Sequence, residues 1–124
     1  MSPAAKSVYY FGFYLYVIGL TLIFAPNFLL STLQIPTTNE VWIRVVGVLA
    51  FCIGYYYHRN AANNDVQFCR TTITTRAFVF VCFASFAMMK LASPMLVGFG
   101  AIDLAGALWT WSALRKTRTA TATA

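Results

Sequence analysis

The segment Gly98–Arg115, GFGAIDLAGALWTWSALR, decides how the chain is interpreted, because it places an aspartate near the middle of an otherwise apolar stretch. A carboxylate at the centre of a membrane helix costs roughly 2.5 to 3.5 kcal/mol, so it normally faces a bundle interior, is protonated, or pairs with a cation. The sequence offers three cations for this pairing: Arg44, Arg76 and Lys90. We therefore expect a buried polar site built around Asp103.

The composition indicates a membrane protein. Of the 124 residues, 60% are hydrophobic and 10% are charged, whereas about 25% of residues are charged in soluble domains. Backbone polar groups in hydrocarbon must be satisfied by helices or by a closed barrel, and the sequence lacks the alternating pattern of barrel strands. An all-α integral membrane fold is predicted.

The net charge of +6 does not point to nucleic acid, because the basic residues are spread over helix ends and form no stripe. The cysteines Cys52, Cys69 and Cys82 lack metal-ligand spacing, and His58 is the only histidine in the sequence. We therefore expect neither a nucleic-acid partner, nor a metal, nor a cofactor.

Four apolar stretches predict a single transmembrane domain over residues 1–115, a four-helix bundle with spans at about 8–25, 41–57, 72–91 and 95–114. Residues 27–40 contain an apolar patch too short to span, which predicts a short interfacial segment between the first two helices. The tail over residues 116–124, KTRTATATA, is of low complexity and is expected to be disordered.

Small and aromatic residues recur at helical spacing on several spans. In the first two spans the shared faces comprise Tyr9, Gly12, Tyr16 and Gly19, and Arg44, Gly47, Phe51, Gly54 and His58. In the fourth span one face comprises Gly100, Asp103, Ala107 and Thr110. Small residues let helices approach closely, so these faces predict packing seams. Tyr16 and Thr110 are also candidates to line a polar core or a ligand site.

Depth favours Arg44 as the partner of Asp103. With a rise of about 1.5 Å per residue, Asp103 lies roughly 13 Å below the outer end of its helix and Arg44 roughly 5 Å below the outer end of its own. An extended arginine spans the difference. The alternatives are that Arg44 extends to the lipid headgroups, and that Asp103 is protonated.

The distribution of cations predicts the orientation. Lys6, Arg59, Arg70, Arg76, Arg115, Lys116 and Arg118 fall on one side of the predicted spans, and Arg44 and Lys90 fall on the other. Cytoplasmic loops carry the excess of Lys and Arg, so both termini are expected in the cytoplasm, and the protein is expected to be multi-pass in a bacterial inner membrane. Arg59, Arg70 and Arg76 are expected to contact the phosphates of lipid headgroups.

The order of residues along the chain resembles a known group of proteins. Gly19 and Pro26 in the first helix, Arg44 and Gly47 opening the second, and an acid inside the fourth are similar to the small four-helix DoxX-like bacterial membrane proteins. The resemblance implies the four-helix architecture and assigns no catalytic residue.

Three functions fit these features, and the sequence favours the first. An accessory or scaffold protein would pack through its Gly and Ala seams into a homo-oligomer or a larger membrane complex, with Asp103 and Arg44 fixing the helix register. A binding or transport protein would enclose an apolar small molecule such as a lipid or a quinone. An intramembrane lipid-modifying enzyme would use Asp103 as acid or base, but no second catalytic group accompanies it.

Overall fold

The computed structural model describes the backbone of residues 1–123 and the side chains of residues 1–116. Its helices are α1 (Pro3–Phe24), α2 (Pro26–Thr32), α3 (Trp42–Ala62), α4 (Val66–Met88) and α5 (Met95–Thr123), and the described backbone contains no strand. The prediction of an all-α fold is confirmed. Apart from Lys116, the tail predicted to be disordered lies outside the residues whose side chains are described.

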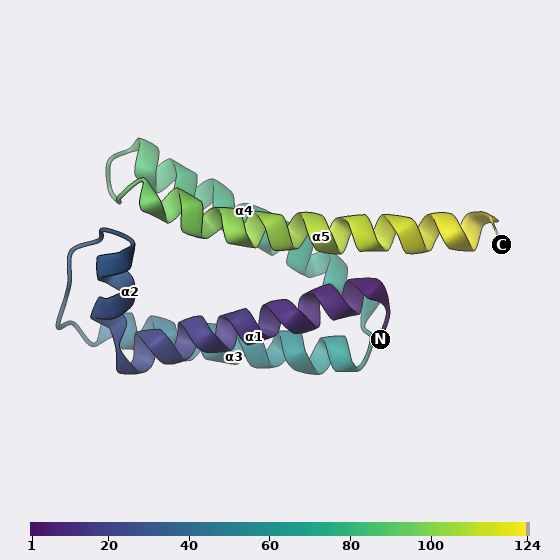
Figure 1. Ribbon diagram of the computed structural model, residues 1–124, viewed down its shortest axis with the longest axis horizontal. Helices are drawn as coiled ribbons and strands as arrows, with labels where there is room; N and C mark the ends of the chain where they lie inside the picture. Colours follow the sequence, from purple (N-terminus) through teal and green to yellow (C-terminus); the bar gives the residue numbers. More distant parts are fainter. Residues whose placement is uncertain (124) are drawn as a thin grey trace.

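The long helices form two antiparallel pairs (Figure 1). One pair is α1 with α3, and the other is α4 with α5. The pairs are joined mainly by packing of α5 on α1, whereas α4 touches α3 only slightly. They converge at the end that holds the N-terminus and diverge toward α2 (Figure 1).

Four glycines bring α1 and α3 into backbone contact. A Cβ added at Gly19 would lie 2.8 Å from the backbone nitrogen of Phe51, and one added at Gly47 would lie 2.8 Å from the carbonyl oxygen of Gly19. Gly12 and Gly54 make a similar contact. A Cβ added at Gly12 would lie 3.1 Å from the carbonyl oxygen of Gly54, and one added at Gly54 would lie 3.0 Å from the carbonyl oxygen of Gly12. The two glycine faces that the sequence predicted to meet protein therefore meet each other.

The connection between α3 and α4 is a tight turn. α3 continues to Ala62, and Asp65 caps α4 by accepting a 3.0 Å hydrogen bond from the backbone N–H of Phe68. Asn64 has a φ of 57°, a left-handed conformation that asparagine tolerates better than most residues. At this end the helices therefore extend beyond the predicted spans 41–57 and 72–91.

Three helical segments are long and apolar enough to cross a membrane: Pro3–Phe24, Val66–Met88 and Met95–Lys116. The chain is accordingly a membrane protein with transmembrane helices. α3 is not among these three, because Arg44, the tyrosines at 55–57 and the polar run at 58–60 lower its hydropathy.

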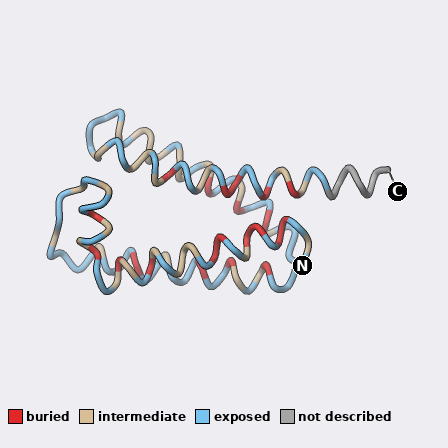
Figure 2. The backbone as a smooth tube through the Cα atoms, viewed as in Figure 1, coloured by how far each residue is buried: buried red, intermediate tan, exposed pale blue. Residues whose placement is uncertain are grey.

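The best-covered core lies where the two pairs converge. Ala4, Ala5, Val8, Ala61 and Cys69 are each at most 1% exposed and belong to one cluster. Figure 2 shows buried positions concentrated toward this end, while the turn between α4 and α5 and the side near α2 carry mainly intermediate and exposed positions. The interior is thus closed at one end and looser at the other.

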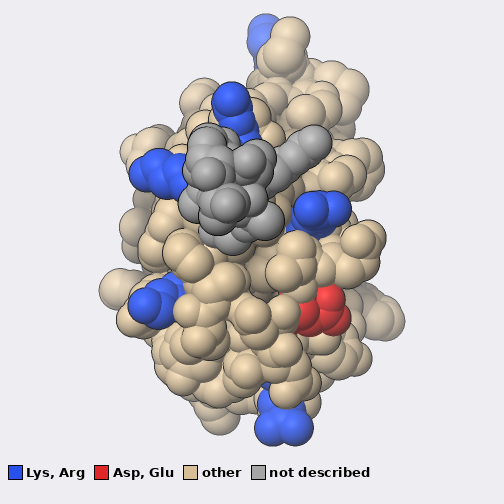
Figure 3. All heavy atoms as spheres, turned by 90° about the vertical axis from the view of Figure 1, so that its right-hand side faces the viewer, with Lys and Arg blue, Asp and Glu red and all other residues tan. Residues whose placement is uncertain are grey.

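Positive charge gathers at the closed end. Lys6 lies near the start of α1, Arg59 near the end of α3 and Arg70 in the first turns of α4. Figure 3 views the molecule from this end and shows Lys and Arg side chains spread around it, with one acidic patch. Near the opposite end the described cations are Arg44, in the first turn of α3, and Lys90, just after α4, so the predicted charge asymmetry between the two ends of the helices is present in the fold.

Candidate functional site

Arg76, near the middle of α4, is a buried cation with 2% of its surface exposed. Its Nε donates to the Thr72 carbonyl oxygen at 3.1 Å, and its Nη2 donates to Thr72 Oγ1 at 3.0 Å and to Thr110 Oγ1 at 2.8 Å. All three acceptors are uncharged. Since removing an ion from water costs on the order of several kcal/mol, the surroundings of Arg76 must compensate its charge.

Aromatic rings and a glycine shape the space around the guanidinium. The Arg76 Cζ lies 4.8 Å from the ring centroid of Phe11 and 5.7 Å from that of Tyr57, within the range at which an aromatic face attracts a cation. A Cβ added at Gly106 would lie 2.8 Å from Arg76 Nη1. Helices α1, α3 and α5 therefore all help to accommodate this one side chain of α4.

A series of hydroxyl groups continues from Arg76 to α1. Thr110, which is fully buried, shares a 2.6 Å hydrogen bond with Ser7 Oγ, which is equally buried. The Ser7 hydroxyl also lies 2.6 Å from the carbonyl oxygen of Ala4. The structure thus places Thr110, a polar-core candidate from the sequence, where it connects α4, α5 and α1.

Asp103 lies one turn from Gly106 on α5 and is half-buried. It is close enough to Arg76, Tyr14 and Tyr57 to interact with them electrostatically. Two buried atoms in this region, Arg76 Nη1 and Tyr14 Oη, have no hydrogen-bond partner among the described residues. Helices α1, α4 and α5 therefore bring a carboxylate and two unused donors into one region, which can bind both a hydrogen-bond acceptor and a donor.

The predicted pairing of Arg44 with Asp103 is wrong. Arg44 is exposed, and its Nη1 donates to the carbonyl oxygen of Ile23 at the end of α1. The depth estimate compared helices that are not close neighbours, because the glycine contacts hold α3 against α1 while α5 packs on α4 and α1. Arg76 is the cation that acts on Asp103.

The predicted contact of Arg76 with lipid headgroups is also wrong, because the side chain is buried. The sequence interpretation placed Arg76 at a helix end, but the cap at Asp65 starts α4 at Val66 and puts Arg76 ten residues inside it. Cys69, Thr72 and Arg76 share a buried face, so an earlier helix start would have revealed the site. Arg59 and Arg70, predicted for the same contact, are exposed.

Tyr16 lies on the other side of α1 from the polar site. Its ring packs against α3, with centroids 4.7 Å from Phe51 and 6.2 Å from His58. Two residues correspond to about 200° around a helix, so Tyr14 takes the position beside Asp103 that the sequence assigned to Tyr16. The glycine and tyrosine face of α1 therefore meets α3 and not the polar site.

The described residues contain no group of three or more His, Cys, Asp and Glu side chains that could hold a metal ion. Cys52, Cys69 and Cys82 are free thiols. Arg76, Asp103 and Tyr14 are the principal groups of the polar site, and they offer hydrogen bonding and charge.

Comparison of the chain with protein-family models, with curated proteins and with solved structures found no match. The resemblance to the DoxX-like proteins therefore stays a prediction.

Proposed function

We propose that this protein binds a small apolar molecule with a polar head, such as a quinone or a lipid, between its two helix pairs. The observation that carries the proposal is the pair of unused donors, Arg76 Nη1 and Tyr14 Oη, in the region of the Asp103 carboxylate. Buried polar groups are nearly always hydrogen-bonded. A polar ligand group placed among them would satisfy both donors.

The charges narrow the class of ligand. Arg76 and Asp103 offset each other, so the site favours a neutral head that accepts hydrogen bonds from Arg76 or Tyr14 and donates one to Asp103. Aromatic surface lies beside these groups, since the Phe99 ring is 6.3 Å from the ring of Tyr14 and 6.3 Å from that of Phe83. A quinone or quinol ring or a lipid alcohol matches this combination.

The proposal includes the membrane arrangement predicted from the sequence. Helices α1, α3, α4 and α5 would cross a bacterial inner membrane as a four-helix domain with both termini in the cytoplasm, and α2 would lie at the outer interface. Two observations support this arrangement. The glycine contacts hold α3 against α1, which is apolar enough to span the membrane, and cations lie at the end of the molecule that holds the N-terminus (Figure 3).

Native mass spectrometry of the protein released from mild detergent, with and without added decylubiquinone, tests the binding proposal. Tyr14→Phe removes only an oxygen that has no hydrogen-bond partner among residues 1–116, so it should leave unfolding unchanged while lowering the occupancy of the bound molecule. Tyr16→Phe is the matched control, because its hydroxyl belongs to the face that meets α3. Unchanged occupancy in Tyr14→Phe would reject the proposed site.

The accessory or scaffold function is the second candidate, and an uncovered stripe on α5 favours it. Gly98, Ala101 and Ala105 are exposed, and a Cβ added at Gly98 would meet nothing within 4 Å. Small residues of this kind allow another helix to approach closely. In the same spectra, a stable homo-oligomer or a larger partner without any bound small molecule would favour this function over binding.

A further inference from the structure

The outer face of the α4–α5 pair carries an apolar groove of about 260 Å³. Six residues line it: Ile73, Ala77, Leu104, Ala107, Leu108 and Trp111. Ile73 directly follows Thr72, and Ala77 directly follows Arg76, so the groove lies on the face of α4 next to the polar site. Both helices are apolar enough to cross a membrane, so we expect lipid around this groove.

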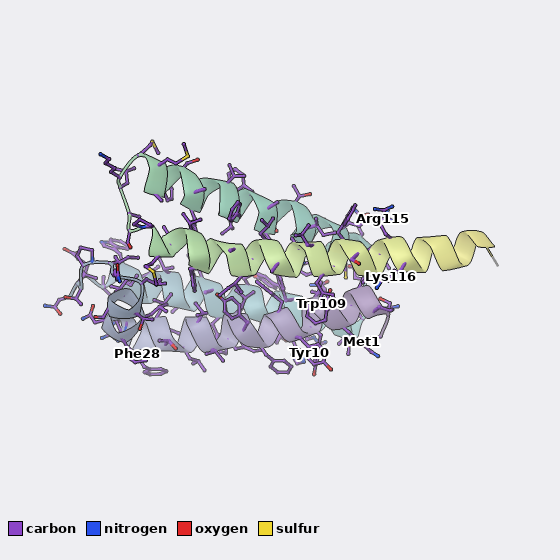
Figure 4. The ribbon with its side chains drawn as sticks, turned by 45° about the horizontal axis from the view of Figure 1, so that its top comes forward. Met1, Tyr10, Phe28, Trp109, Arg115 and Lys116 are labelled. Carbon is purple, nitrogen blue, oxygen red and sulfur yellow. The ribbon has the colours of Figure 1, made fainter. Side chains whose placement is uncertain are left out.

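A second hollow of about 250 Å³ adjoins the groove. It is lined by Arg70, Trp111, Leu114 and Arg115, and it shares Trp111 with the groove. The guanidinium of Arg115 lies over the Trp111 ring, with Cζ 4.8 Å from the centroid. In Figure 4 the Arg115 side chain extends from the upper side of α5. The groove and the hollow therefore form one surface, which is apolar on one side of Trp111 and cationic on the other.

We propose that this surface binds one anionic phospholipid, with an acyl chain along the apolar groove and the phosphate group between Arg70 and Arg115. Charge complementarity identifies the occupant, because guanidinium groups bind phosphate oxygens through paired, charge-assisted hydrogen bonds. Trp111 stands where the two parts meet, and tryptophan is enriched at the level of the headgroups. The site is separate from Arg76 and Asp103, so it goes beyond the proposed function.

The position of the surface in the fold agrees with this occupant. Arg70 lies in the first turns of α4 and Arg115 late in α5, at the end of the molecule where the other cations gather (Figure 3). Juxtamembrane cations attract anionic lipids, whereas the groove supplies an apolar wall deeper along the same helices. A soluble anion would bind only in the cationic hollow and would leave the apolar groove empty. A protein partner would not need to carry a phosphate group.

Lipid titration followed by native mass spectrometry tests the site. The full chain, delipidated in detergent, is titrated with phosphatidylglycerol or with phosphatidylcholine of the same acyl chains. Arg70→Gln and Arg115→Gln should each weaken phosphatidylglycerol binding about fivefold and leave the weaker phosphatidylcholine binding unchanged. Lys6→Gln removes an exposed cation at the same end on α1; it is the control and should bind like the original protein.

The groove is tested separately by filling it. Ala77→Phe should reduce phosphatidylglycerol binding, whereas Ala101→Phe, an exposed position on α5 outside the groove, should not. Equal binding of the two lipids, or equal effects of Arg70→Gln and Lys6→Gln, would overturn the proposal. Inorganic phosphate is titrated as a further arm, and arginine-dependent binding of phosphate that Ala77→Phe leaves intact would identify a soluble-anion site in place of a lipid site.

Discussion

A guanidinium inside a membrane protein can be stabilised without a bonded carboxylate, and Arg76 illustrates how. Its hydrogen bonds go to the oxygens of two threonines, and the rings of Phe11 and Tyr57 lie within cation–π range. Thr110 is central to this arrangement, because one hydroxyl oxygen accepts from Arg76 and also bonds to Ser7. Removing that hydroxyl would leave the guanidinium short of an acceptor.

Thr110→Val should therefore lower the free energy of unfolding by about 1 to 3 kcal/mol, the cost of leaving a buried polar group without its partner. The shape of the side chain is retained, so packing changes little. The measurement is denaturant unfolding in detergent, followed by helical circular dichroism. Thr74→Val, at an exposed position on the same helix as Arg76, is the isosteric control, and an equal loss in both variants would contradict the role assigned to Thr110.

Close backbone contacts at four glycines, Gly12, Gly19, Gly47 and Gly54, hold α1 against α3. A Cβ added at Gly19 would lie 2.8 Å from the backbone nitrogen of Phe51 and 2.9 Å from the carbonyl oxygen of Gly47. Backbone atoms cannot rotate away as a flexible side chain does. An added methyl group must therefore separate the two helices along their length.

Gly19→Ala should destabilise the protein by about 1 to 3 kcal/mol, the usual cost of overpacking a close contact. Gly98→Ala is the matched substitution at a helical glycine with nothing within 4 Å, and it should be neutral or stabilise by up to about 1 kcal/mol through helix propensity. Unfolding titrations with sodium dodecyl sulfate compare the two. If both variants unfold at the same detergent fraction, α1 and α3 do not depend on this contact.

The whole molecule consists of two helix pairs that pack closely at one end and more loosely at the other (Figures 1 and 2). At the closed end Tyr10 of α1 and Trp109 of α5 stack with centroids 6.3 Å apart (Figure 4). The polar site lies between the closed end and the looser one. Since α3 is less apolar than the other long helices, the number of membrane crossings depends on α3.

An even number of crossings places Lys6 and Lys116 on the same side of the membrane, whereas three crossings place them on opposite sides. We expect the same side, because the glycine contacts hold α3 along α1. In a variant lacking Cys52, Cys69 and Cys82, single cysteines at these two positions should react with an impermeant maleimide only after the cells are opened. A cysteine at Lys90 should react in intact cells, and the reverse pattern would contradict the predicted orientation.

Much of the fold can be predicted from local features of the sequence. The apolar stretches and the glycine spacing of α1 and α3 were readable in the sequence, because hydropathy and helical periodicity depend on neighbours along the chain. The polar residues before Arg76 resemble a loop and therefore predict a surface position for it, although Asp65 caps a helix there. Depth along the helices favours Arg44 as the partner of Asp103, but depth does not say which helices touch.

The sequence by itself determined that the chain is an all-α membrane protein and that Asp103 and Thr110 belong to one helix face. Tertiary structure alone decided which cation acts on Asp103 and which tyrosine lies beside it. The physical reason is that the partners of a buried polar group depend on helix adjacency. Here the backbone contacts of Gly19 and Gly47 hold α3 on α1 and leave Arg76 of α4 to meet α5.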